Sequence, residues 1–137
     1  MAGYSGRALV DKLGVKPGTR LALINAPDGF DLGPLPAGVR LLRRGQAPLD
    51  TAVVFVTARA DLERRWPALT AALAPAGALW VAWPKRTAVQ AQGIVTDMTE
   101  HSVREVALPT GWVDTKVCAI DDTWSGLKCV LRVESRR

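Results

Sequence analysis

Polar and aromatic side chains follow three of the strands that the sequence predicts, and these residue types are suited to holding a ligand. They are Asn25 and Asp28 after the first strand, Trp83 and Lys85 after the fourth, and Asp121, Trp124 and Ser125 after the fifth. In an open α/β sheet, ligands bind outside the carboxyl ends of the strands, so we expect these side chains to share one rim. Carboxylates, a lysine and two indole rings at one rim predict a pocket with an ion pair and aromatic walls. A small anionic or nucleotide ligand would suit such a pocket.

The same residues also have a purely structural interpretation. Asparagine and aspartate are common in turns, and Lys85 could balance a nearby aspartate at the surface. For Asp121 and Asp122, a turn between two hairpin strands is favoured over acid–base or metal chemistry, because a metal site needs more ligands at defined spacing. The single histidine, His101, has no identifiable nucleophile as a partner. We therefore assign no catalytic residue and expect neither a metal nor a cofactor.

The elements that would position these residues are six strands and three helices. The strands are residues 20–26, 39–44, 51–57, 78–83, 114–120 and 126–133, and the helices are residues 5–13, 59–74 and 99–110. Residues 27–38 hold three prolines and three glycines, which exclude a long crossover helix there. Residues 85–98 are expected to form a polar connection. Apolar strands alternating with helices predict a parallel sheet with right-handed crossovers.

The fold class that follows is a single α/β domain over residues 1–137. We expect a reduced Rossmann or methyltransferase-like sandwich of three layers, with the sheet order second, first, third, fourth, sixth, fifth. The sixth strand should run antiparallel, because only a short link joins it to the fifth. A hydrophobic content of 48% fits a chain that buries its own core.

The two cysteines, Cys118 and Cys129, are too few for a disulfide framework and favour a reducing compartment. A hairpin symmetric about Thr123 and Trp124 would place them face to face as a redox pair. Two buried thiols that pack as small hydrophobic groups are the favoured interpretation. Neither a signal peptide nor a membrane span is visible, so we expect a soluble, cytoplasmic protein with no membrane partner.

The net charge of +5 raises the chance of an anionic partner. The basic residues are scattered, however, and form only small groups at residues 40–44, 64–65 and 132–137. A nucleic-acid face would need the first and last of these groups to be contiguous, and would usually add exposed aromatic rings. We therefore interpret the charges as ordinary solvated surface and do not expect nucleic acid as a partner.

Two segments resemble class I S-adenosylmethionine methyltransferases: LGVKPG at residues 13–18, before the first strand, and LAPAGALWV at residues 73–81. The predicted terminal hairpin also matches their sheet. The resemblance implies a glycine-rich cofactor loop after the first strand and an acidic residue, for the ribose, after the second. This sequence instead has Asn25, Ala26, Pro27 and Asp28 at the loop, and its second strand ends in two arginines.

Nearly the full length also resembles an uncharacterised bacterial family, domain of unknown function 3052. The residues that carry this resemblance are GYSG at 3–6, NAPDG at 25–29, FVT at 55–57, WPK at 83–85 and WSGLK at 124–128. The family implies a fold and no activity. Together the two resemblances favour a non-catalytic binding or regulatory module that has lost the cofactor loop, with a protein partner or a second copy as its ligand. An enzyme or binder of a small anionic or nucleotide ligand, and a weak nucleic-acid binder, remain as alternatives.

Overall fold

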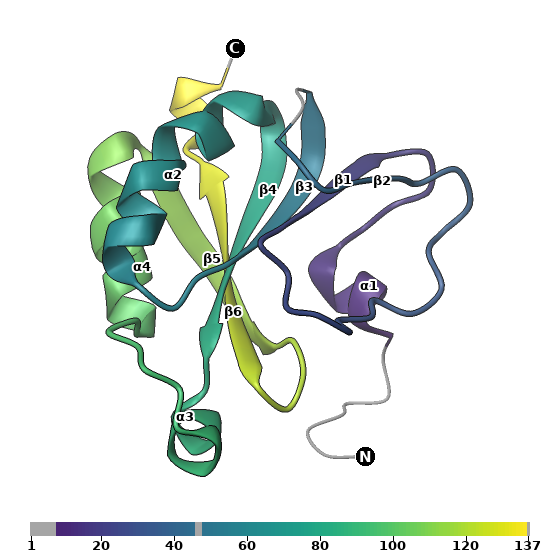
Figure 1. The fold of residues 1–137 in the computed structure, drawn as a ribbon. Helices are drawn as coiled ribbons and strands as arrows, with labels where there is room; N and C mark the ends of the chain where they lie inside the picture. Colours follow the sequence, from purple (N-terminus) through teal and green to yellow (C-terminus); the bar gives the residue numbers. More distant parts are fainter. Residues whose placement is uncertain (1–7, 46–47, 137) are drawn as a thin grey trace.

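The computed structural model describes residues 8–45 and 48–136, and within them six strands form one twisted sheet (Figure 1). In chain order the elements are α1 (Leu9–Leu13), β1 (Arg20–Ile24), β2 (Arg40–Leu42), β3 (Leu49–Phe55), α2 (Arg59–Ala72), β4 (Leu73–Pro84), α3 (Arg86–Gln92), α4 (Glu100–Ala107), β5 (Trp112–Ala119) and β6 (Trp124–Leu131), with 3-10 turns at Leu108–Thr110 and Val133–Ser135. The chain is therefore of the mixed α/β class, as the sequence predicts.

The sheet has the order β2-β1-β3-β4-β6-β5, which confirms the predicted order. Strands β1 to β4 are parallel, and β6 is antiparallel to both β4 and β5. The ends of β1 to β4, the end of β5 and the start of β6 consequently share one edge, which we call the carboxyl edge. Pro84 pairs with Trp124 there, and the Lys85 amide donates a 2.8 Å hydrogen bond to the Thr123 carbonyl.

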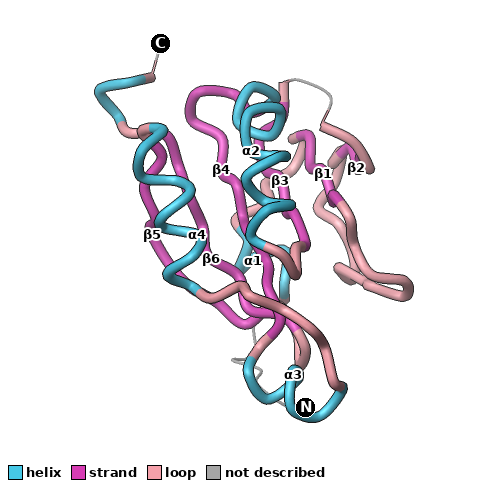
Figure 2. Tube along the Cα trace, turned by 60° about the vertical axis from the view of Figure 1, so that its left-hand side comes forward, coloured by secondary structure: helices cyan, strands magenta, loops and turns pink. Residues whose placement is uncertain are grey.

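Helices cover the two faces of the sheet unequally, as Figure 2 shows. Helices α2 and α4 pack on one face, the helix face, through Leu62, Trp66 and Val103 among others. The short α1 packs on the opposite face, the α1 face, through Val10 and Leu13. The central strands β3 and β4 are buried on both faces, which is why they read as continuous apolar runs in the sequence.

Three tryptophans, Trp66, Trp80 and Trp112, lie in the core. Trp66 and Trp112 meet edge to face with ring centroids 6.4 Å apart, and the Trp66 indole N–H donates to Thr110 Oγ1 at 2.9 Å. Trp80 is fully buried on the α1 face and donates to the Leu13 carbonyl at 3.0 Å. The indole N–H groups of Trp66 and Trp80 therefore each have a partner that also fixes a neighbouring helix or turn.

Two parts of the predicted element pattern need correction. The connection at 85–98 contains a helix, α3, which ends at Gly93 with φ 67°. This helix was missed because it buries only Ala88 and so shows no apolar stripe. Strand β4 also starts five residues earlier than predicted, at Leu73. Residues 5–7 of the predicted first helix lie outside the described residues.

The cysteines do not form the redox pair considered above. In the β5–β6 ladder Cys118 is opposite Gly126, and Cys129 is opposite Asp114. Cys129 lies in the core of the helix face, whereas Cys118 packs against the core of the α1 face. The sheet thus separates the two thiols, and both are free.

Candidate functional site

Asn25 joins the turn after β1 to the end of β3. Its φ is 61°, and it is the one described residue other than glycine with a left-handed backbone. Asparagine tolerates this conformation better than most residues because its short side chain can bond locally. Here its Nδ2 donates a 2.7 Å hydrogen bond to the Phe55 carbonyl. The turn therefore keeps a glycine-like backbone at Asn25 and again at Gly29, where φ is 78°.

Asp121 closes the β5–β6 hairpin. Its Oδ1 accepts hydrogen bonds of 2.8 Å from the amides of both Thr123 and Trp124. This is the turn geometry that aspartate favours, and it occupies one oxygen of the carboxylate. Asp28, by contrast, is exposed in the turn that follows β1. The two carboxylates therefore have different surroundings, and the ion pair expected between Lys85 and an aspartate is not among those formed by the described residues.

Trp83 and Trp124 do not line one pocket, which corrects the expectation of a shared aromatic wall. Trp83 is opposite Ser125 and lies in the core of the helix face, with 7% of its surface exposed. Trp124 is opposite Pro84 and half-buried on the α1 face, where its ring meets that of Phe55 edge to face at 5.1 Å. Because successive side chains alternate between the faces of a sheet, one step in register separates the two indoles.

A pocket of about 360 Å³ lies at the carboxyl edge on the helix side. We call it the β4 pocket, and it is lined by Trp83, Pro84, Arg86, Val89, Thr96, Met98, Thr99 and Glu100. Its apolar walls come from the end of β4 and from the segment before α4, and its two charged groups come from α3 and α4. Such a mixture of apolar walls and a few polar groups is typical of small-molecule sites.

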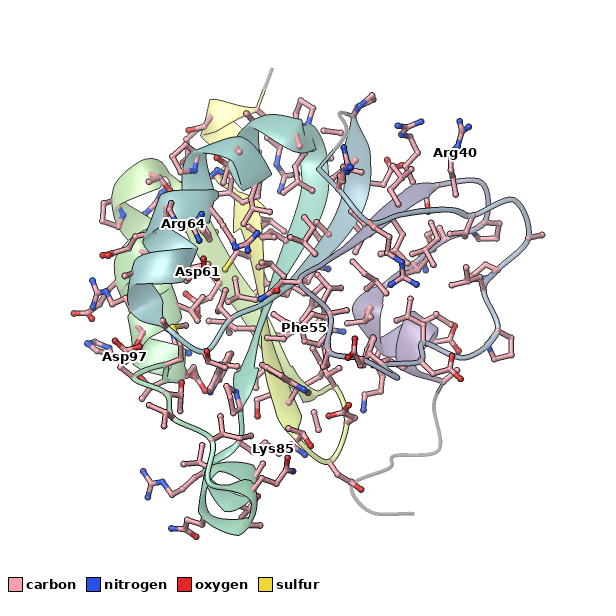
Figure 3. All side chains as sticks on the ribbon, viewed as in Figure 1. Arg40, Phe55, Asp61, Arg64, Lys85 and Asp97 are labelled. Atoms are coloured by element: carbon pink, nitrogen blue, oxygen red, sulfur yellow. The ribbon has the colours of Figure 1, made fainter. Side chains whose placement is uncertain are left out.

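The segment that forms one wall of the β4 pocket is held by hydrogen bonds. Thr96 Oγ1 donates to the Thr57 carbonyl at 2.6 Å, and the Asp97 carboxylate accepts from the Arg59 amide at 2.8 Å. Asp97 thereby caps α2, whose own N-cap residue offers no side-chain bond. Figure 3 places Asp97 beside this helix and Lys85 next to α3. The wall is therefore fixed to the ends of β3 and α2 before any ligand binds.

The charged groups of the pocket differ in their partners. Glu100 forms an ion pair with Arg104, which also contacts Asp114 at 2.9 Å. The hydrogen bonds that Arg104 donates, first to Asp114 and then to Glu100, raise the pKa of its guanidinium above its ordinary value. Arg86 is exposed, and no carboxylate of the described residues pairs with it. The pocket thus presents the Glu100 carboxylate, which is already paired with Arg104, and the Arg86 guanidinium, which has no partner among the described carboxylates.

Sequence reasoning found only part of this pocket. Of the seven candidate residues only Trp83 lines it, although Lys85 immediately precedes Arg86. The other lining residues were missed because α3 was not predicted and because residues 96–100 follow no strand. The signal available was Gly93, a possible helix stop shortly after the fourth strand.

Other groupings considered from the sequence do not form. Among the described residues, no three histidine, cysteine or acidic side chains gather as a metal site. Of the arginines at 40–44, the first begins β2 and the other two follow it, at one edge of the sheet, whereas Arg132 follows β6, next to the other edge. No described helix combines the length and the apolar character needed to cross a bilayer.

Solved structures similar to this chain include methyltransferases. Magnesium protoporphyrin IX methyltransferase from Synechocystis PCC 6803 with bound SAM is 12% identical and aligns over 90% of this chain and 74% of its own, with a TM-score of 0.62. Ribosomal protein L11 methylase from Lactobacillus delbrueckii subsp. bulgaricus is 12% identical over 90% of this chain and 75% of its own, with a TM-score of 0.55. The Methanococcus jannaschii fibrillarin pre-rRNA processing protein is 11% identical over 85% of this chain and 68% of its own, also with a TM-score of 0.55.

These similarities confirm the methyltransferase-like fold. No family model and no curated protein sequence matches the chain, so the resemblance to domain of unknown function 3052 stays a prediction. The interpretation as a non-catalytic module is contradicted, because the similar structures include one enzyme solved with SAM and again with SAH. That interpretation took the missing glycines as loss of the ligand site. Asn25 supplies a left-handed residue without glycine, and a pocket is present at the carboxyl edge.

Proposed function

We propose that this chain binds S-adenosylmethionine at the carboxyl edge of the sheet and belongs to the methyl-transferring enzymes. The observation that carries the proposal is the β4 pocket, which opens at this edge of a methyltransferase-like sheet. Its volume of about 360 Å³ falls within the range of small-molecule sites. Similar structures have been solved with SAM and with SAH bound.

The lining residues fit a ligand that carries both charges and an apolar part. The guanidinium of Arg86 would attract a carboxylate, and the carboxylate of Glu100 would attract an ammonium group. Trp83 and Met98 offer an aromatic and a polarisable surface, which suits a sulfonium cation. Bound S-adenosylmethionine would supply an electrophilic methyl group on sulfur.

The chain's own residues would orient the ligand and exclude water from it. Trp83 and Met98 are both buried against the core, which sets the position of the apolar surface that they offer. The hydrogen bonds of Thr96 and Asp97 fix the segment that carries Met98 to the ends of β3 and α2. A fixed, apolar wall is the arrangement that holds a reacting group in one orientation.

Thermal unfolding with and without S-adenosylmethionine or S-adenosylhomocysteine tests this proposal. A ligand present at a hundred times its Kd adds about 2.7 kcal/mol to the stability, which raises the Tm by several degrees. Such a shift is expected with both compounds. The absence of any shift at millimolar concentrations would contradict the proposal.

A nucleotide without a sulfonium is the second candidate, favoured by Arg86, which pairs with no carboxylate of the described residues. ADP and AMP in the same experiment distinguish the two. A shift with these nucleotides and none with the adenosyl sulfur compounds would favour the second candidate.

A further inference from the structure

Two lysines face each other across the β5–β6 hairpin on the α1 face. Lys116 is opposite Lys128 in the ladder, and Lys128 is in turn opposite Trp80 on β4. The Trp80 side chain points toward α1, because its indole N–H bonds the Leu13 carbonyl at 3.0 Å. Directly paired residues share a face of the sheet, so both lysines lie on the α1 side.

The α1 region adds two more cations to this surface. Lys12 lies on α1, and Lys16 lies in the turn that follows it. Burial, and then the charges of Lys116 and Lys16, lower the pKa of Lys128. Burial raises the pKa of the Cys118 thiol, while Lys12 and Lys116 act to lower it. Lys12, Lys16, Lys116 and Lys128 are therefore near one another, and we call them the lysine face.

None of these four lysines forms an ion pair with a carboxylate in the part of the chain that the structure describes. The ion pairs formed among the described residues lie on the helix side: within α2, within α4, between α2 and α4, and from α4 to Asp114. Like charges directly opposite each other on neighbouring strands destabilise a sheet. Most charged groups of α2 and α4 thus pair with one another, whereas the α1 face brings four lysines together without such pairs. The lysine face could not be predicted from the sequence, because Lys12 and Lys16 lie far along the chain from Lys116 and Lys128.

We propose that the lysine face binds the phosphate backbone of a nucleic-acid duplex. A duplex carries about one negative charge per 1.7 Å of its axis, so it can match several lysines spread over a sheet and a helix. The described rings on this side are engaged: Trp80 is fully buried, and Trp124 packs edge to face against Phe55. Proteins that bind single strands stack the bases on exposed aromatic rings. Because the described rings on this side are already packed, a duplex is favoured over a single strand. Contacts to phosphate alone would bind many sequences with similar affinity.

This inference goes beyond the proposed function and is independent of it. The β4 pocket lies on the helix side of the sheet, and the lysine face lies on the other side. Duplex binding can therefore be measured with no adenosyl compound present. Failure of one proposal leaves the other intact.

The test is fluorescence anisotropy of labelled duplexes of about 20 base pairs, of DNA and of RNA, between about 50 and 200 mM salt. The variant Lys116→Gln/Lys128→Gln should bind at least tenfold more weakly. The slope of log K against log salt should become shallower by about 2, roughly one for each lost phosphate contact. The control Arg40→Gln/Arg64→Gln removes the same charge elsewhere and should keep the slope of the wild type.

A second variant, Lys12→Gln/Lys16→Gln, leaves the sheet untouched and should also bind the duplexes more weakly. It keeps the test valid if the hairpin variant fails to fold. Vesicles containing phosphatidylserine test the other polyanion. Binding to vesicles without binding to either duplex would overturn the proposal. So would a wild type that binds no duplex at about 50 mM salt, or lysine variants that bind as tightly as the arginine control.

Discussion

The side-chain amide of Asn25 donates a 2.7 Å hydrogen bond to the main-chain carbonyl of Phe55, while the Asn25 backbone is left-handed with φ 61°. One residue thus turns the chain after β1 and ties that turn to the end of β3. Both strands end at the carboxyl edge, where the proposed ligand binds. The relationship explains how this turn forms without the three glycines expected of a phosphate-binding loop.

Two replacements of Asn25 separate what its hydrogen bond and its left-handed backbone each contribute to the stability. Asn25→Ala should lose the hydrogen bond, about 1 kcal/mol, and strain the left-handed backbone by about 1 kcal/mol more. Asn25→Gly should lose only the hydrogen bond, so it should be the more stable of the two variants. Urea unfolding with a single cooperative transition would measure both free energies. Equal stability of the two variants would contradict a role for the backbone conformation.

Gly77, at the start of the buried part of β4, has no room for a side chain. A Cβ there would lie 3.0 Å from the carbonyl oxygens of both Ala74 and Leu49. Main-chain atoms cannot move aside cheaply, so Gly77→Ala should cost about 1–3 kcal/mol of stability. Gly45→Ala is the matched control, because among the described residues its Cβ would meet the Ala72 methyl group alone, at 3.5 Å. Similar stabilities of the two variants in urea would disprove the close approach at Gly77.

Because of Cys129, the free energy of unfolding should depend on pH in the alkaline range. Burial, and then the charge of Asp114, raise the pKa of its thiol from 9.0 to about 12. Between these two values the unfolded chain loses the proton and the folded chain keeps it, so stability should fall as pH rises. The expected slope is about 1.4 kcal/mol per pH unit.

The measurement is chemical unfolding of the wild type and of Cys129→Ala from pH 8 to pH 11. The variant should be less stable at pH 8, because it leaves a small cavity, and should show a flatter pH dependence. If the free energy of unfolding of the variant fell with pH as steeply as that of the wild type, groups other than Cys129 would cause the loss of stability at alkaline pH. The buried thiol should also react with a thiol reagent only after unfolding.

The strand order was predictable from the sequence because the central strands are buried on both faces. Residues 51–56, for example, are all buried, and their mostly apolar run is typical of a strand that is covered on both faces. The capped start of α4 was also predictable, since Thr99 bonds the Ser102 amide as an N-cap should.

The contents of the site were harder to predict, because they depend on single steps of register. Trp83 and Trp124 both reach the carboxyl edge, as expected, yet the pairing of Pro84 with Trp124 puts the two rings on opposite faces. Helix α3 buries one alanine and gave no periodic signal. The lysine face joins residues from the two ends of the chain, which only the completed sheet brings together.

Calorimetric titration with S-adenosylhomocysteine, compared between the wild type and Arg86→Ala, tests the central claim most directly. Arg86 is exposed and forms no ion pair with the described carboxylates, so its loss should leave the fold unchanged. The account predicts saturable binding by the wild type and at least tenfold weaker binding by the variant, about 1.4 kcal/mol or more. Arg64→Ala, which removes an exposed cation on α2, should bind like the wild type. No binding by the wild type at millimolar ligand, or equal affinity in Arg86→Ala, would contradict an adenosyl site in the β4 pocket.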